Sequence, residues 1–546
     1  MTPAQINLRP QITPTPLNPS GTSQSPPKST SAVRCFAVLT FAAAGMAVLI
    51  SFLPAVGHDQ LWCLYVAQRL LHGSKLYGPE LLETNPPLIM GMLLIPAALG
   101  NLLHLPVTLL FKLGVLLTEI VSALLSLHLL RRLEPNLTPA KLWSLAFAFI
   151  AVFAILPARD LGQRDHLLAI LCLPYVIAAA LDASHRRKTS LLLKITIGIL
   201  AGLGICLKPH HILIPLFIEA ALIYKNRSLR QLLRPELLAL IATGLTFLVT
   251  IRLITPAYLT EVVPLLRDVY WAIGYLTLPQ LITESLQLHI LAAITLALYL
   301  WLKPRSPLPT LLILAGAAAT IAYYLQGTGW YYQQIPALSF FALALWFLLI
   351  ELADRLQLRT PSWTPKAALA LSILALVLTA HFSGYTLAKP LSFPSGLSDI
   401  PDPSFFSNLP PGTPVAILST VVDDTIPPIA THHLLWAQRT NNLWALPAIL
   451  RSEDPLGHPP QRLIPPARLA QLDRMQHAWM VEDLNRWNPP LILVLRCEDP
   501  TVQCQILEDR HDNLLAWFQR DPAFRTVFAN YHYLRSSGPY DAYVPN

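Results

Sequence analysis

The chain has 546 residues, of which 53% are hydrophobic and 13% are charged, and its mean hydropathy is +0.48. An average soluble domain has roughly 25% charged residues, so this composition predicts a polytopic membrane protein rather than a soluble enzyme. Six cysteines are too few for a secreted disulfide scaffold, and the net charge of +8 is not gathered into a basic domain, which excludes a nucleic-acid binder.

The charge divides the chain into two regions. Residues 391–546 contain 11 Lys and Arg against 16 Asp and Glu, whereas residues 1–390 contain 28 against 15. The first region is apolar with short basic loops, and the second has ordinary soluble composition. We therefore expect a disordered cytoplasmic tail over residues 1–33, a transmembrane domain over 34–386 and an external α/β domain over 387–546.

The transmembrane region begins with an apolar run from Cys35 to Val56, which we interpret as an uncleaved first span that enters from the cytoplasm. Ten more apolar runs follow, and most have the 17–25 residues that cross about 30 Å of hydrocarbon. We therefore expect an α-helical membrane protein with about eleven transmembrane helices. The further runs lie at residues 106–130, 141–157, 166–183, 190–207, 209–224, 235–256, 284–302, 308–326, 334–352 and 366–386.

The stretch from Pro86 to Leu99 is apolar for only about fourteen residues, which predicts a segment in the membrane interface rather than a crossing. The positive-inside rule supports this interpretation. If the stretch does not cross, Arg131, Arg132 and the later basic loops all lie on the cytoplasmic side. This topology leaves the N-terminus in the cytoplasm and the C-terminal domain outside, as in a bacterial inner membrane with its tail in the periplasm.

The C-terminal region alternates strand-like and helix-like runs and predicts a small α/β domain. Cys497 and Cys504 lie in it, in a compartment where disulfides persist, so both a disulfide and two free thiols are open. We expect strands at residues 414–422, 491–496, 524–533 and 540–544, and helices at 429–439, 467–487 and 511–520.

The first external loop carries His58 and Asp59 directly after the first span. A helix is predicted from about Asp59 to His72, with Gly73 as its C-cap and an apolar face that includes Trp62. A second apolar helix is expected after the break at residues 85–87. The loop thus predicts two interfacial helices that hold a carboxylate at the membrane surface.

This loop resembles the GT-C membrane glycosyltransferases, which include lipid A aminoarabinose transferases and protein O-mannosyltransferases. The resemblance covers roughly residues 34–350. It rests on an Asp after the first span, an Ala-x-x-Leu-Leu-x-Gly helix end, a Tyr four residues further on and an Asn-Pro-Pro-Leu segment, which are Asp59, Ala67, Leu70, Leu71, Gly73, Tyr77, Asn85, Pro86, Pro87 and Leu88.

The resemblance implies transfer of a sugar from a polyprenyl-phosphate carrier to a lipid, glycan or protein acceptor on the external face. It gives Asp59 the role of acceptor base, and it places a second acid where the next external loop enters a span, a position that Asp165 matches better than Asp160. In the family this acid assists the acceptor or a divalent metal, so a metal is a candidate cofactor. From the residues alone, Asp59 could instead cap the helix that follows it.

The second external loop packs Arg159, Asp160, Arg164 and Asp165 between two membrane helices, where charges are costly unless they pair or bind something. The two arginines are candidates for binding the carrier or substrate. The alternative is an Arg–Asp network that holds the loop in place, and both interpretations can be true together.

Four further residues are candidates for binding the carrier: Lys208, His210, Tyr332 and Arg267. Lys208 lies at an external turn, where a cation could hold the carrier phosphate or simply anchor the interface. His210 and His211 follow it, but on a helix they would point in different directions, and the sequence shows no Cys or Glu that completes a zinc site. Tyr332 fits either a carrier site or an aromatic belt, and Arg267 is a weaker candidate in another external loop.

These residues predict a membrane glycosyltransferase with a lipid-delivered donor, because the cytoplasmic loops contain no Gly-rich phosphate turn or Asp-x-Asp element for a nucleotide sugar. Two alternatives stay open. A transporter or flippase for a lipid-linked saccharide would be expected to show internal repeats and ionisable groups at the bilayer midplane. A noncatalytic envelope-assembly protein could keep the same fold.

Overall fold

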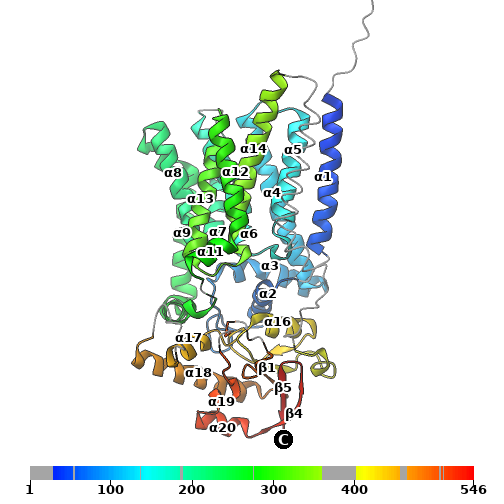
Figure 1. Ribbon diagram of the computed structural model, residues 1–546, viewed down its shortest axis with the longest axis vertical. Coiled ribbons are helices and arrows are strands. Elements are labelled where there is room, and N and C mark those ends of the chain that lie inside the picture. Colours follow the sequence, from blue (N-terminus) through cyan, green and yellow to red (C-terminus); the bar gives the residue numbers. More distant parts are fainter. Residues whose placement is uncertain are drawn as a thin grey trace, which may run out of the picture.

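The computed structural model describes residues 29–52, 56–135, 137–184, 189–274, 276–359, 401–454, 464–502, 504, 506–507 and 510–546. A bundle of helices forms one end of the molecule, and a small domain with a five-stranded sheet caps the other (Figure 1). Residues 1–28 of the tail expected over 1–33, the eleventh predicted span at 366–386 and the start of the predicted external domain lie outside the described residues. The end of that tail was predicted wrongly, because the first helix already begins at Ser29.

Every predicted span that falls on described residues is helical. Six helices among the described residues are long and apolar enough to cross a membrane, or seven if the bent pair α11 and α12 is one span. The bundle helices are α1 (Ser29–Phe52), α4 (Val107–Leu133), α5 (Pro139–Ile150), α6 (Arg164–Ala183), α7 (Leu191–Leu207), α8 (Leu213–Asn226), α9 (Pro235–Ile254), α11 (Leu278–Glu284), α12 (Leu286–Leu302), α13 (Leu308–Gln326) and α14 (Ile335–Arg359). The short helix α10 (Val263–Val269) contacts α17 (Leu446–Glu453) of the sheet domain.

Several predicted spans form helices of fewer than 18 residues. The helix α7 ends at Leu207, because Pro209 follows and cannot continue its hydrogen-bond ladder. Residues 209–212 form a 3-10 turn before α8, which has 14 residues. The helix α5 continues into a π-helical turn over Ala151–Ile155. The length and composition of the helices therefore do not by themselves support the predicted count of eleven transmembrane helices.

The helix α6 lies at the centre of the bundle. Nearly all of its residues are buried, and it packs against α4, α7, α13 and α14. A helix that is apolar on all sides is expected to be surrounded by other helices. Its first turn carries Arg164, Asp165 and His166, so the packing of α6 fixes these polar residues at the end of the bundle that faces the sheet domain.

Two short helices, α2 (His58–Leu71) and α3 (Leu88–Leu103), lie between the bundle and the sheet domain (Figure 1). The 16 residues of α3 agree with the expectation that residues 86–99 are too short to cross. Gly73 has a φ of +93° just after the end of α2, as expected for a C-cap glycine. The buried surface of α2 extends beyond the one apolar face that the sequence predicts, because α16 (Val422–Thr431) of the sheet domain also packs on this helix.

The sheet has the strand order β2-β1-β3-β5-β4, with parallel pairing among β1, β2 and β3 and antiparallel pairing at β5. The strand β3 is buried along its whole length, which explains its uninterrupted run Leu-Ile-Leu-Val-Leu. The strands are β1 (Pro414–Leu418), β2 (Leu435–Trp436), β3 (Leu491–Leu495), β4 (Tyr531–Ser537) and β5 (Tyr540–Pro545), and the further helices are α17 (Leu446–Glu453), α18 (Pro466–Trp487), α19 (Leu514–Phe518) and α20 (Pro522–Phe528).

Two predictions in this domain were wrong. The predicted strand at 524–533 begins as the helix α20, because Asp521 caps it through the N–H of Ala523 and Pro522 stands at its first position. The predicted helix at 429–439 ends at residue 431, and the chain then forms β2 beside β1. Cys497 and Cys504 form a disulfide, which decides between the disulfide and the two free thiols that the sequence left open.

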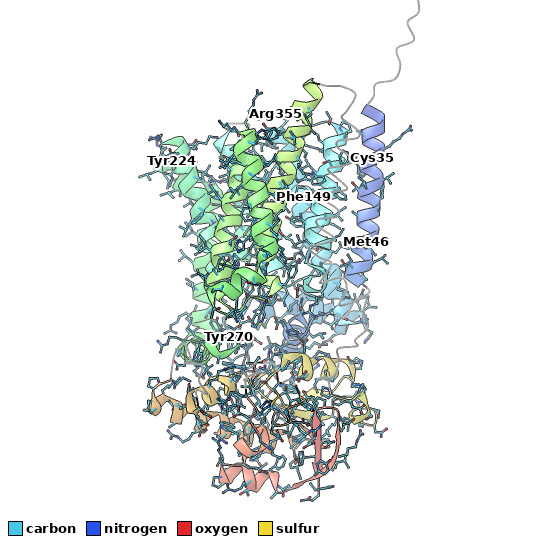
Figure 2. The ribbon with its side chains drawn as sticks, viewed as in Figure 1. Cys35, Met46, Phe149, Tyr224, Tyr270 and Arg355 are labelled. Atoms are coloured by element: carbon cyan, nitrogen blue, oxygen red, sulfur yellow. A yellow bond between two sulfur atoms is a disulfide. The ribbon has the colours of Figure 1, made fainter. Side chains whose placement is uncertain are left out.

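The basic loops gather at the end of the bundle opposite the sheet domain. Figure 2 shows Cys35, Tyr224 and Arg355 there, whereas Tyr270 lies near the sheet domain. Lys141 pairs with Asp354 at 2.6 Å, and Arg234 pairs with Asp182 at 2.8 Å. The chain therefore separates its basic loops from the loops that carry the candidate site.

Candidate functional site

The candidate site forms where three segments meet below the bundle: the first turn of α2, the loop before α6 and the turn after α7. Gly57 is the N-cap of α2, so Asp59 stands inside the first turn and does not occupy the capping position. The packing of α6 against α7 brings the loop before α6 to the turn after α7, and Gln163 and Arg164 of that loop contact Asp59 of α2.

Asp59 is held by three side chains. Its Oδ2 accepts a hydrogen bond from Nε2 of Gln163 at 3.1 Å and lies 3.7 Å from Nη2 of Arg164. Its Oδ1 lies 3.5 Å from Nε2 of His58. Burial raises the pKa of the Asp59 carboxyl, but His58, Arg164 and Gln163 outweigh burial and the net pKa is lowered. Asp59 is therefore an ionised carboxylate at neutral pH.

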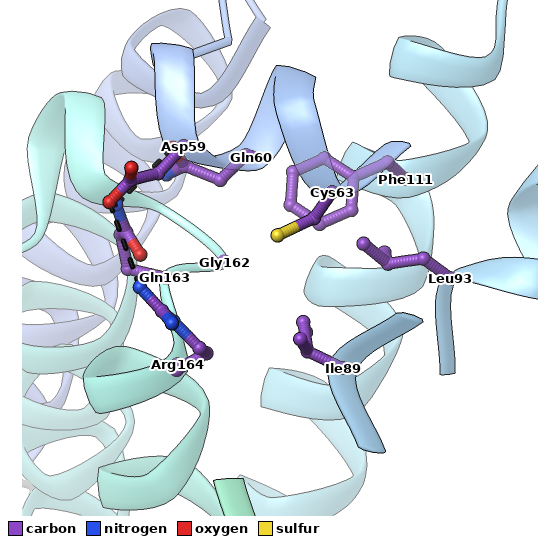
Figure 3. A pocket seen from close by; sticks show the side chains of 9 residues that line it. All are labelled: Asp59, Gln60, Cys63, Ile89, Leu93, Phe111, Gly162, Gln163 and Arg164. Carbon is purple, nitrogen blue, oxygen red and sulfur yellow. Dashed lines mark hydrogen bonds and ion pairs between the residues drawn. The ribbon is translucent and has the colours of Figure 1, made fainter. Parts of the chain in front are cut away.

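Asp59 lines a cavity with one polar and one apolar wall (Figure 3). Asp59, Gln163 and Arg164 lie along the polar side. The other residues around it are Gln60, Cys63, Ile89, Leu93, Phe111 and Gly162, and the enclosed volume is about 10 Å³, the space of one water molecule. A carboxylate and a guanidinium thus face aliphatic and aromatic side chains across one small space, and side chains must move apart before a sugar phosphate can enter it.

Gly162 is required for the shape of this cavity. Its φ is +77°, a conformation that residues with a Cβ rarely adopt. A Cβ at this position would lie 2.4 Å from Cζ of Phe111 and 2.8 Å from Cγ2 of Val115. The glycine lets the loop before α6 approach α4 closely, and this approach places Gln163 and Arg164 beside Asp59.

Asp165 is fully buried and is paired with Lys208 from the turn after α7. Their Oδ2 and Nζ atoms are 3.2 Å apart, and Nε2 of His211 lies 3.4 Å from Oδ1. Lys208 also donates to Oε1 of Gln326 at 3.1 Å, and its Nζ lies 5.5 Å from the centre of the Tyr332 ring. The second predicted acid and two of the predicted carrier residues therefore form one group.

Asp165, His210 and His211 offer ligand atoms within 4.8 Å of one another. The argument that the two histidines point apart was wrong, because they lie in a 3-10 turn and their ring centres are 4.8 Å apart. Two imidazoles and a carboxylate suit zinc. However, the Lys208 ammonium already neutralises Asp165, so these residues do not fit a divalent metal in this arrangement.

The other predicted residues are placed differently. Arg164 is buried beside Asp59, whereas Arg159 is exposed and lines a second cavity with Lys112. Burial and its neighbours His211 and Lys208 lower the pKa of His210 to about 3, so His210 offers no positive charge to a phosphate at neutral pH. The side chain of Arg267 is 73% exposed and lies 3.6 Å from its neighbour Asp268, outside the group around Asp59.

Several residues of the site were missed by sequence reasoning. Gln163 stands among four charged residues, and nothing in the sequence marked it as the partner of Asp59. Glu83 is buried, and it accepts hydrogen bonds from the indole N–H of Trp62 and from the backbone N–H of Asn85, the latter at 2.7 Å. Burial raises its pKa, and its contacts shape the break before α3. An acid two residues before Asn85 in an apolar loop was the available signal.

No family model and no curated protein matches the chain. Two solved structures of ArnT from Cupriavidus metallidurans, one bound to undecaprenyl phosphate and one in the apo state, match with a TM-score of 0.52 and 15% sequence identity. The match covers 92% and 94% of this chain and 97% and 98% of the ArnT chains. The oligosaccharyltransferase AglB from Archaeoglobus fulgidus matches at 12% identity and a TM-score of 0.46 over 94% of this chain and 74% of its own, too low to add to the argument.

The ArnT match extends over both the helical bundle and the sheet domain. The match confirms the GT-C fold that we expected from the loop after the first span. At 15% sequence identity the match shows the fold and does not assign an activity. The chain has the GT-C fold, a polytopic helical membrane domain followed by a small C-terminal α/β domain.

Proposed function

We propose that the protein is a glycosyltransferase that moves a sugar from a polyprenyl-phosphate carrier to an acceptor at the outer face of the membrane. The observation that carries this proposal is the cavity in which the ionised Asp59 and the guanidinium of Arg164 face an apolar wall. A donor with an apolar tail, a phosphate and a sugar matches this distribution of polar and apolar groups. The similarity to ArnT, of which one structure is bound to undecaprenyl phosphate, supports the same class of donor.

The reaction needs a base for the acceptor and a cation for the leaving group. Asp59 takes the proton of the acceptor hydroxyl while the hydroxyl oxygen of the acceptor attacks the anomeric carbon of the sugar. The bond between that carbon and the phosphate oxygen breaks, and the polyprenyl phosphate leaves with the electron pair. Arg164 stands next to Asp59 and stabilises the charge that develops on the phosphate. Gln163 orients the base.

Asp165 and Lys208 have a supporting role in this proposal. Asp165 is fully buried, its charge is balanced by Lys208, and the imidazole of His211 lies 3.4 Å from its Oδ1. This group lies at the start of α6, directly beside Arg164 in the chain, and it fixes the end of α6 from which Arg164 extends. Tyr332 packs against Lys208 and closes this side of the group.

The orientation of the chain follows from its charges. The basic loops lie at the end opposite the sheet domain, and the positive-inside rule assigns this end to the cytoplasm. The site and the sheet domain then face the outside, which in a bacterial inner membrane is the periplasm. A donor delivered by a lipid carrier can reach this face, whereas a cytoplasmic nucleotide sugar cannot.

The test uses the purified full-length protein in nanodiscs with a panel of undecaprenyl-phosphate sugars, each radiolabelled in the sugar. We expect one label to leave the carrier, and we expect Asp59→Asn to lower this transfer at least about 100-fold, because general-base catalysis contributes 10²–10⁴-fold. The matched control is Asp499→Asn, the same change at a partly exposed carboxylate of the sheet domain.

Two results would contradict the proposal. An Asp59→Asn protein that transfers sugar at the normal rate would remove the mechanism. A label that crosses the bilayer while it stays attached to its carrier would identify a flippase instead. Insertion and the elution volume of each variant show whether the fold is retained.

A further inference from the structure

The sheet domain contributes a carboxylate to the surroundings of Asp59. Asp423 stands in the first turn of α16, and its Oδ1 lies 2.6 Å from Nδ1 of His58. The other ring nitrogen of His58, Nε2, lies 3.5 Å from Oδ1 of Asp59. One imidazole therefore lies between the predicted base and a residue that is 365 positions further along the chain than His58.

Asp423 is held in place by the packing of α16. The next residue, Asp424, is buried and accepts hydrogen bonds from Oγ of Ser419 at 3.0 Å and from the hydroxyl of Tyr540 at 2.7 Å. The hydroxyl of Thr425 donates to the carbonyl of Asn441 at 2.7 Å. These bonds tie the first turn of α16 to strand β5 and to the loop after β2, so the position of Asp423 is set by the core of the sheet domain.

The helix α2 and the loop that follows it are joined to the same domain by further polar contacts. The N–H of Trp436 donates to the hydroxyl of Tyr65 at 3.0 Å, and the N–H of Leu82 donates to the carbonyl of Arg439 at 2.7 Å. At a more distant point, Nε of Arg468 lies 2.7 Å from Oδ2 of Asp268. Both ends of the contact between Asp423 and His58 are therefore fixed by their surroundings.

The charges around His58 favour its protonated form. Burial lowers the pKa of its imidazole, but Asp59 and Asp423 outweigh burial and raise the pKa to about 9. Arg159 opposes them, and Asp160 also faces this group. A protonated imidazole donates from both nitrogens, whereas a neutral one has a single N–H. Only the protonated ring can donate to Asp59 and Asp423 together.

We propose that Asp423 is a positioning residue of the transferase, which holds His58 so that His58 fixes the carboxylate of Asp59 toward the cavity. This inference rests on the proposed function, since it assigns the sheet domain a part in the same site. The domain that follows the membrane region is then a component of the active site, and its docking on α2 prepares the base.

The first test measures the imidazole of His58 directly and needs no substrate. The full-length protein is labelled with ¹³C at Cε1 of histidine and titrated in nanodiscs, and the His58 signal is identified by its absence in His58→Gln. We expect a midpoint near 9 in the unmodified protein, and a midpoint lower by at least about one unit in Asp423→Asn, because a carboxylate in contact shifts a pKa by about 1–3 units.

Two control variants separate charge from docking. Asp499→Asn removes a partly exposed carboxylate of the same domain, and Arg468→Gln removes the ion pair with Asp268 of α10, which also joins the domain to the preceding part of the chain. Neither residue touches His58, so both variants are expected to keep its midpoint. An unchanged midpoint in Asp423→Asn would overturn the inference.

The second test measures turnover with the donor that the unmodified protein uses. We expect Asp423→Asn to lower kcat about tenfold with little change in KM, Asp423→Glu to recover part of the loss, and the basic limb of the pH profile to move to lower pH in Asp423→Asn. In a His58→Gln background, Asp423→Asn is expected to cost nothing further.

Additive losses in the double variant would mean that Asp423 acts only through docking, and would refute the positioning role. The outcome is separable from the proposed function. An active Asp59→Asn protein removes the function, whereas the midpoint of His58 reports the contact with Asp423 whatever reaction the protein catalyses.

Discussion

Lys208 neutralises a carboxylate that has no access to water, so its removal tests how the site is stabilised. Its Nζ lies 3.2 Å from Oδ2 of Asp165, whose side chain is 0% exposed. At an effective dielectric constant of 20, two unit charges at this separation attract by about 5 kcal/mol. Lys208→Met leaves the Asp165 charge with the weaker contact to His211. Breaking a buried pair from one side costs about 3–5 kcal/mol, and we expect a loss of this size.

The assay is thermal unfolding in detergent, followed by tryptophan fluorescence, with transfer measured in parallel. The double variant Lys208→Met with Asp165→Asn removes both charges, so it is expected to unfold at a higher temperature than Lys208→Met alone while transfer stays low. Lys75→Met makes the same change at an exposed lysine and should leave unfolding unchanged. The reasoning is refuted if Lys208→Met unfolds like the unmodified protein, or if the double variant is no more stable than the single one.

Two further predictions concern the backbone around the site and the sheet domain. Gly162→Ala is expected to destabilise the protein by about 1–3 kcal/mol and to lower transfer, because of the φ of +77° and the 2.4 Å approach to Phe111; adding Phe111→Ala should restore part of the transfer, and an unaffected single variant would contradict this account of the cavity. Replacing Cys497 and Cys504 by Ser removes a disulfide that closes a short loop, for which loop-closure entropy predicts a loss of about 2.5 kcal/mol. Protease resistance of the sheet domain measures this loss, and a dithiothreitol-treated sample should match the double Ser variant; equal resistance of the oxidised protein and the variant would refute it.

The sequence was sufficient for the elements whose signal is local. An apolar run marks a helix in the bundle wherever it lies in the described residues, because the hydrocarbon of a membrane selects for length and apolar composition. The shortness of the segment around α3 could be predicted in the same way. Local signals failed at residues 429–439, where β2 forms only because β1 offers a partner strand.

The candidate residues show the same division. Asp59, Asp165 and Lys208 could be singled out because charges are scarce in an apolar chain, so each one next to a span is conspicuous. Gln163 and His58 were missed as partners of Asp59, since a glutamine or histidine in a polar loop carries no such signal. His210 and Arg267 were predicted from their residue type alone. Burial lowers the pKa of His210, so that it carries no charge at neutral pH, whereas the side chain of Arg267 is exposed and lies outside the group around Asp59.

The sequence by itself determined the membrane class, the division into an apolar and a soluble part, and the loops in which a carboxylate could act. The tertiary structure decided which side chains meet: Arg164 and Gln163 with Asp59, Lys208 with Asp165, and Asp423 with His58. Composition and periodicity depend on neighbouring residues, so they can be read along the chain. The contact between His58 and Asp423 depends on how α16 packs on α2, and these two helices share one hydrophobic core whose segments lie far apart in the sequence.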